Sequence, residues 1–284
     1  MTIKATQILS LLGFCLLLGS SVFADTLWDN GDGDFIIINS LNWASGLPNN
    51  LGNDGIISNG DTVISDGRHD LDDKNFVVSG GSKIHHTSTV NQLRWEDGTI
   101  TLNGGHLEVD YAGTTVIGRD SGSLTTLNIY AGSTVDLAGG LEVGRLSQGL
   151  VNQYGGSMLV NGTINIQTNG TGVSSDNIYH LSGGTVTGNN FVVYDRNADN
   201  SNWFNFTPGS TGSLTIKQSS FDFASFINAD EIRINNLSAT VSDFTIDTSV
   251  GGQTTISVIP EPGSFILVLG GFALLFIGIR RRVR

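Results

Sequence analysis

The stretch TVIGRDS at residues 115–121 returns as LEVGRLS at residues 141–147, an offset of 26 residues. A looser copy, FVVYDRN, follows at residues 191–197. Between these copies, YAGS at residues 130–133 returns as YGGS at residues 154–157. A degenerate period of about 25 residues with three short strands per period is what one turn of a β-solenoid requires. Because one turn cannot bury its apolar side chains alone, stacked turns must share one continuous core.

The rest of the sequence also indicates β structure. No sustained helical period is found between Asp25 and Ile259; short β-branched runs alternate with Gly, Asn, Asp and Ser instead, for example at residues 62–65, 99–102 and 106–109. This pattern predicts an all-β chain with tight turns. We expect a right-handed parallel β-solenoid (β-helix), with a β-sandwich as the alternative. The expected divisions are an N-terminal cap at 25–60, solenoid repeats at 61–200 and a C-terminal β region at 201–258.

The N-terminus predicts export. Lys4 precedes an apolar run from Ile8 to Leu18, and small or short residues lead up to Ala24. This order indicates a signal peptide at residues 1–24, cut between Ala24 and Asp25 by signal peptidase. Cys15, the single cysteine, lies inside that peptide. The mature chain is therefore expected to have no disulfide and no thiol chemistry.

The C-terminus combines three features in a fixed order. Pro260-Glu261-Pro262 comes first, and residues 263–279 then carry no charged side chain. As a helix this segment would be about 25 Å long, near the short limit for crossing a bilayer. It is followed by a cluster of arginines, which should stay on the cytoplasmic side of the membrane. These are Arg280, Arg281, Arg282 and Arg284.

This tail resembles the PEP-CTERM sorting domain of exopolysaccharide-producing Gram-negative bacteria, across residues 259–284. The resemblance implies that an exosortase-type membrane protease recognises Pro260, Glu261 and Pro262. It further implies a transient inner-membrane anchor, followed by sorting to the cell surface, the outer membrane or the extracellular matrix. A plain tail anchor is the alternative interpretation.

The repeats resemble the glycine-rich β-helical passenger regions of bacterial surface and autotransporter proteins. Trp28 and Asn42-Trp43 resemble the motif with which such proteins often begin. Repeats of this kind are widespread and do not indicate one function. They support the solenoid fold and leave its ligand open.

The charge balance narrows the choice of partners. Residues 25–262 hold all 26 acidic residues and nine of the 14 Lys and Arg residues, so their formal charge is nine minus 26, or −17. Such an acidic domain lacks the basic surface that binding to nucleic acid requires. It suits a soluble exported protein, and its carboxylates are compatible with divalent cations.

Acidic turns are the calcium candidates of this sequence. Asp29, Asp32 and Asp34 lie close together, but their order departs from the EF-hand pattern because Gly31 occupies a ligand position. An acidic turn without metal is the simpler interpretation. The same ambiguity applies to a second cluster, Asp70, Asp72 and Asp73. No cofactor is predicted beyond this open question of calcium.

No catalytic residue is predicted. His85 and His86 would face opposite sides of a strand and cannot serve one site there. Arg94, Glu96 and Asp97 could be compared with the groove residues of β-helical polysaccharide lyases, but a shared fold does not establish an activity. Thr99/Thr101 and Thr185/Thr187 raise an ice-binding surface as a minor alternative. We therefore predict a non-enzymatic structural or adhesive protein of the cell surface or exopolysaccharide matrix, with carbohydrate binding or cleavage as the alternative.

Overall fold

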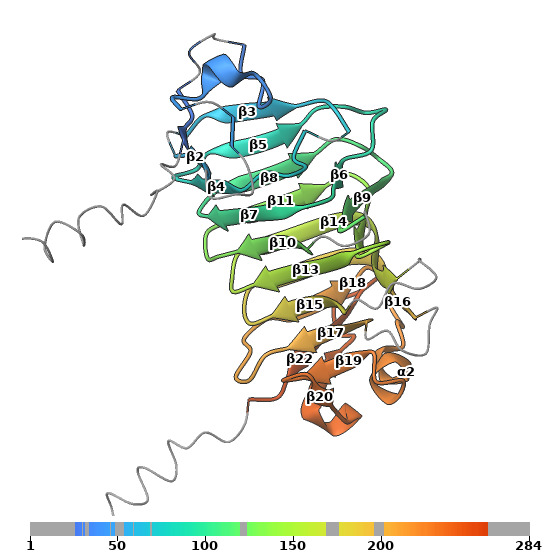
Figure 1. Ribbon diagram of the computed structural model, residues 1–284. Helices are drawn as coiled ribbons and strands as arrows, with labels where there is room; N and C mark the ends of the chain where they lie inside the picture. The colour runs from blue at the N-terminus through green and yellow to red at the C-terminus, as the bar shows by residue number, and fades with distance from the viewer. Residues whose placement is uncertain are drawn as a thin grey trace, which may run out of the picture.

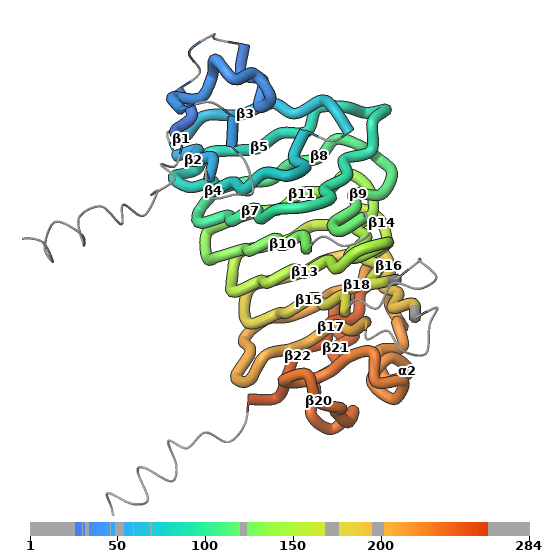
Figure 2. Tube along the Cα trace, in the orientation of Figure 1, coloured from blue at the N-terminus to red at the C-terminus, as the bar shows by residue number. Residues whose placement is uncertain are grey.

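The computed structural model describes residues 26–260, except 30, 32–33, 46, 49–53, 59, 69, 120–123, 169–175 and 196–201. It is a β-solenoid of about seven turns. The chain coils turn upon turn from the N-terminal to the C-terminal end of one elongated body (Figures 1 and 2).

Two sheets run along the length of the solenoid. The first sheet has ten strands in the spatial order β1 (Thr26–Leu27), β2 (Gly55–Ile57), β4 (Phe76–Ser79), β7 (Gly98–Asn103), β10 (Leu124–Ile129), β13 (Gln148–Gln153), β15 (Asn177–Leu181), β17 (Asn202–Phe206), β19 (Ile232–Ile234) and β20 (Leu237–Ser238). The main path of the second, 12-stranded sheet is β3 (Thr62–Ser65), β5 (Lys83–His86), β8 (His106–Val109), β11 (Thr134–Leu137), β14 (Ser157–Thr168), β16 (Thr185–Asp195), β18 (Ser213–Ile216), β22 (Thr254–Val258) and β21 (Phe244–Asp247). Strands β6 (Arg94–Trp95), β9 (Thr114–Ile117) and β12 (Gly140–Val143) branch from it and, with the second halves of β14 and β16, form what we call the third side.

The predicted solenoid is confirmed, and the sandwich alternative is wrong. Neighbouring strands along both sheets come from successive turns and are parallel up to β19 and β18, whereas a sandwich is built from antiparallel sheets. Leu141 pairs with Thr115, so the 26-residue offset of the repeat is one turn. Antiparallel pairing between named strands of the described residues occurs at the C-terminal end, where β22 and β21 follow β18 and β20 follows β19; two isolated antiparallel bridges, Trp28–Trp43 and Ser79–Gly104, lie earlier.

The core is a column of apolar side chains inside the coil. Strand residues alternate between buried and partly exposed positions, as in β10, where Leu127 and Ile129 are buried and Asn128 faces outward. Glycines with positive φ turn the chain at the corner between the two sheets. At Gly184 (φ 80°) a Cβ would lie 2.2 Å from the carbonyl oxygen of Gly156 in the preceding turn. A side chain there would push two turns apart.

Aromatic side chains fill both ends of the coil. Near the N-terminal end, Trp28 packs edge-on against Trp43 at 5.1 Å, and Trp43 packs against Phe76 at 5.9 Å between ring centroids. The 3₁₀ helix η1 (Ser40–Asn42) leads into Trp43. Near the C-terminal end, helix α2 (Phe223–Asn228) adds Phe226, which lies 5.1 Å from Phe191. The 3₁₀ helix η2 (Val241–Asp243) precedes β21.

Both targeting segments lie outside the described residues: the expected signal peptide (1–24) and the expected span (263–279). Among the residues that the structure does describe, no helix has both the length and the apolar character needed to cross a membrane.

Candidate functional site

The outer face of the first sheet carries a column of polar side chains. Thr101, Asn128 and Asn152 occupy the same position in three successive turns. The Asn152 amide donates to Asn128 Oδ1 at 3.0 Å, and the Asn128 amide donates to Thr101 Oγ1 at 3.3 Å. His180 and Asn205 continue the column toward the C-terminal end. The result is a regular row of hydrogen-bonding groups along the solenoid axis, one per turn.

Two exposed tyrosines flank this column. Tyr130 directly follows β10 and Tyr154 directly follows β13, with exposed fractions of 39% and 49%. Their rings are stacked, with centroids 4.8 Å apart and planes 20° apart. We call Thr101, Asn128, Asn152, Tyr130 and Tyr154 the tyrosine–asparagine face. It combines amphipathic aromatic rings with amide and hydroxyl groups at the spacing of neighbouring strands.

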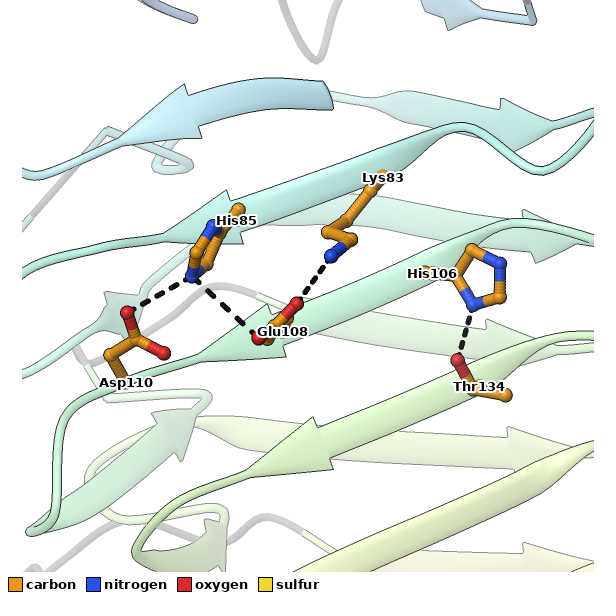
Figure 3. A network of polar contacts seen from close by, with 6 residues as sticks. All are labelled: Lys83, His85, His106, Glu108, Asp110 and Thr134. Atoms are coloured by element: carbon orange, nitrogen blue, oxygen red, sulfur yellow. Dashed lines mark hydrogen bonds and ion pairs between the residues drawn. The ribbon is translucent and has the colours of Figure 1, made fainter. Parts of the chain in front are cut away.

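A charged cluster lies on the outer face of the second sheet (Figure 3). The imidazole Nε2 of His85 on β5 lies 3.0 Å from Asp110 Oδ2 and 3.8 Å from Glu108 Oε1. The Lys83 ammonium donates to the other oxygen of Glu108, Oε2, at 2.5 Å. That hydrogen bond lowers the pKa of Glu108 below its ordinary value. We call Lys83, His85, Glu108 and Asp110 the charged cluster. On the same strand as Glu108, His106 contacts the hydroxyl of Thr134, which lies in the next turn along the same face.

Sequence reasoning missed this cluster. The expected alternation is confirmed, because His85 faces outward while His86 is fully buried between Ser65 Oγ and the Asn91 carbonyl oxygen, each 3.0 Å away. The alternation alone predicts no partner for His85. Its partner Glu108 lies 23 residues further on and pairs with it across β5 and β8. Only the register of those two strands could have revealed the contact.

The threonine pairs lie on different faces. Thr99 and Thr101 belong to the first sheet, whereas Thr185 and Thr187 belong to the second. A short hydroxyl array does cover β16, β18 and β22, through Thr185, Thr187, Ser213, Thr215, Ser257 and Thr255. In the two preceding turns, Leu159 and Asp136 occupy the position of Thr187. The array is therefore interrupted, which weakens the case for an ice-binding surface.

The acidic turns use their carboxylates to hold the backbone. Asp34 accepts hydrogen bonds from the backbone N–H of Ile36 and from the amides of Asn39 and Asn42, and these bonds lower its pKa. Asp29 accepts from the Gly31 N–H at 3.1 Å. Asp32, the third calcium candidate, lies outside the described residues. The two described aspartates therefore have a structural explanation that needs no ion.

The second acidic cluster is likewise engaged in turns. Asp70 is buried and its Oδ2 accepts from Ser65 Oγ and from the N–H groups of Asp66 and Gly67. Asp72 Oδ1 accepts from the Glu96 N–H at 3.0 Å, so it ties one turn to the next.

The residues compared with lyase grooves also have structural contacts. Arg94 Nε donates to Gln92 Oε1 at 3.0 Å. The Asp97 carboxylate accepts from the Gly98 N–H, and its carbonyl oxygen accepts from Trp95 Nε1. These contacts hold the corner between β6 and β7 in place. They do not bring the side chains together around one point.

On the third side, the buried carboxylate of Glu142 interacts with the two arginines of the repeat, Arg119 and Arg145. Glu142 is 5% exposed, and its Oε1 lies 2.5 Å from the Gln167 amide and 3.6 Å from Arg145 Nε. Burial raises the pKa of Glu142, while the Gln167 hydrogen bond and the charges of Arg145 and Arg119 oppose that rise. Since the pKa in the folded state is raised, the protonated form stabilises the fold below the ordinary pKa of 4.5, and this contribution is lost as the pH rises through the raised value.

We expect the substitution Glu142→Gln to raise the free energy of unfolding at pH 7 and to flatten its dependence on pH above 4.5. The neutral amide removes the burial cost of the charge and keeps a polar partner for Gln167. Urea unfolding at a series of pH values measures both effects. Glu108→Gln is the matched control. Because the pKa of Glu108 is lowered, its substitution should reduce the free energy of unfolding at pH 7. Equal shifts in the two variants would contradict this interpretation.

The sorting residues fall at the edge of what the structure describes. Pro260 lines a hollow of about 640 Å³ at the C-terminal end of the solenoid, together with Leu237 and Ile259. The other predicted targeting residues lie outside the described residues: Ala24, Asp25, Glu261, Pro262, Arg280, Arg281, Arg282 and Arg284. Comparisons with models of protein families, with curated proteins and with solved structures find no match to this chain.

Proposed function

We propose that this chain is an exported structural protein that binds exopolysaccharide through the tyrosine–asparagine face, without cleaving it. The stacked pair Tyr130 and Tyr154, exposed beside the column of Asn128 and Asn152, is the observation that carries the proposal. Sugar rings present apolar C–H groups that pack on aromatic rings and hydroxyl groups that bond with amides.

The solenoid suits a polymer better than a small molecule. Successive strands lie about 4.8 Å apart, so a chain of sugars lying along the axis meets a new set of side chains at every turn. Each contact is weak, but contacts made by one polymer add through effective concentration. A flat face with repeated groups therefore binds a long polysaccharide more tightly than it binds a short fragment.

A non-catalytic role fits the contacts of the second acidic cluster and of Asp97, one of the residues compared with lyase grooves. Asp70, Asp72 and Asp97 accept hydrogen bonds from backbone N–H groups. Carboxylates engaged in this way stabilise turns and are poorly placed to exchange protons with a substrate.

The proposal includes export and sorting through the two ends of the chain. Residues 1–24 act as the signal peptide, and Pro260-Glu261-Pro262 with the apolar segment 263–279 acts as the exosortase signal. Two observations support the second part: β22 ends at Val258, and the Ile259 N–H still donates to the Asp243 carbonyl oxygen at 2.9 Å. The recognition motif thus begins directly at the end of the folded domain.

The handedness of the solenoid is part of the same proposal. Parallel strands joined by crossover connections favour a right-handed coil.

We expect the double variant Tyr130→Ser/Tyr154→Ser to bind the host's exopolysaccharide at least about 10-fold more weakly, because truncating a contacting aromatic side chain typically costs more than 1 kcal/mol. Affinity electrophoresis of the full chain, in gels that contain the polymer, measures the change. Tyr194→Ser is the matched control, since Tyr194 is 44% exposed and lies on β16 of the second sheet, outside the tyrosine–asparagine face.

The control should migrate as the wild type does. If the double variant is retarded as strongly as the wild type, the tyrosine–asparagine face is not the binding surface. If the Tyr194 variant loses retardation to the same extent, the contact lies elsewhere on the solenoid.

A further inference from the structure

We propose that His85, Glu108 and Asp110 form a binding site for a divalent first-row transition metal ion, with Zn²⁺ as the best match. The site lies on the second sheet and does not depend on the polysaccharide proposal. Its three ligand atoms are one imidazole nitrogen and two carboxylate oxygens, which lie within 4.8 Å of one another.

The spacing of these atoms suits one small ion. His85 Nε2 is 3.0 Å from Asp110 Oδ2 and 3.8 Å from Glu108 Oε1. Bonds of about 2.0–2.1 Å in tetrahedral geometry place neighbouring ligand atoms about 3.4 Å apart. The two observed distances lie on either side of that value. The Glu108 and Asp110 oxygens lie within 4.8 Å of each other, so movement of these two partly exposed carboxylates toward one ion would complete the geometry.

The backbone fixes the ligand positions. His85 lies on β5 and pairs with Glu108 on β8, and the Asp110 N–H donates to the His86 carbonyl oxygen at 2.9 Å. All three ligands thus project from two hydrogen-bonded turns of the solenoid. Two of the ligands lie on strands, and Asp110 directly follows β8 and is held by its backbone hydrogen bond; such positions are more precise than those of free loops, which favours a preformed site.

Lys83 orients one ligand. Its ammonium group binds Glu108 Oε2 at 2.5 Å, which turns the other oxygen, Oε1, toward His85. Outer contacts of this kind commonly hold ligating carboxylates in position. Lys83 offsets one of the two negative charges, so with a neutral imidazole the cluster keeps one net negative charge, which attracts a dication.

The ligand set selects the class of ion. An imidazole nitrogen with carboxylate oxygens suits zinc and neighbouring transition metals, whereas calcium and magnesium prefer sites made of oxygen alone. The side chains of Glu108 and Asp110 are 36% and 40% exposed, so the remaining coordination positions face solvent. In the absence of metal, the same contact serves as a hydrogen bond between His85 and Asp110.

Metal titration of the full chain in detergent separates these two interpretations. We expect isothermal titration calorimetry with Zn²⁺ to show one binding site in the wild type. His85→Gln should weaken that binding at least about 10-fold, because losing a residue that only supports a metal ligand already costs about that much. Co²⁺ provides a second readout, since its visible absorption bands report coordination directly. His106→Gln is the matched control, because His106 lies on the same face and bonds to Thr134 outside the three-ligand set.

The control should bind Zn²⁺ as the wild type does. No binding at millimolar Zn²⁺, or equal binding by the wild type and His85→Gln, would overturn the proposal. Asp110→Asn keeps the test decisive if His85→Gln does not fold, since it removes a different ligand from an exposed position. Far-ultraviolet circular dichroism confirms that each variant keeps its strands.

Discussion

Replacing Phe204 with alanine is expected to lower the free energy of unfolding by about 3–5 kcal/mol. Phe204 on β17 is fully buried, and its ring centroid lies 4.9 Å from Tyr179, 5.2 Å from Phe206 and 5.8 Å from Phe191. Phe206 lies on the same strand as Phe204, whereas Tyr179 on β15 and Phe191 on β16 belong to the preceding turn, so Phe204 joins neighbouring turns within one core. Its removal would leave a cavity that the hydrogen-bonded strands on either side cannot close.

Equilibrium unfolding in urea measures the loss. The exposed Leu237, at 66%, is the control, and Leu237→Ala should change the free energy of unfolding by less than about 0.5 kcal/mol. A loss below about 1 kcal/mol for Phe204→Ala would show that the turns do not share a cooperative core. Comparable losses in the two variants would contradict the described burial.

Replacing Pro260, Glu261 and Pro262 together with alanine is expected to leave the protein at full length in the inner membrane. The proposed signal peptide and the apolar segment 263–279 are unchanged in this variant, so the proposed export and anchoring should proceed. The protease would lose the motif that it is proposed to recognise, and processing should fall to background.

Fractionation of the host's membranes followed by immunoblotting measures this outcome. Ser264→Ala changes a neighbouring residue outside the motif and should be processed as the wild type is. Normal release of the triple variant would contradict the sorting proposal. If both variants stay at full length in the inner membrane, processing depends on the start of the apolar segment and not on the motif alone.

The repeat was sufficient to predict the solenoid, but not the whole register. The copies at 115–121 and 141–147 lie in adjacent turns, whereas the copy at 191–197 is two turns further on. The copy between them begins at Ile164, in the second half of β14, and was not recognised. The register of β14 shifts between Val160 and Thr163, and polar Asn165 and Gln167 follow, so this copy lacks the Gly-Arg signature of its neighbours.

The two candidate sites differ in how far they could be predicted. The repeated Tyr-x-Gly-Ser segments indicate that Tyr130 and Tyr154 occupy equivalent positions in neighbouring turns, but they do not show that the two rings are exposed and stacked. The charged cluster could not be predicted, because turn length varies. His85 and Glu108 are 23 residues apart, whereas Thr115 and Leu141 are 26 apart. A fixed period cannot bring such residues together; only the paired strands can.

The most direct test of polysaccharide binding without cleavage is size-exclusion chromatography of the host's exopolysaccharide before and after incubation with the purified full chain, with calcium present. We predict that the protein elutes with the polymer and that the polymer keeps its chain length. Elution of the protein apart from the polymer would contradict binding, and a shortened polymer would contradict the absence of cleavage.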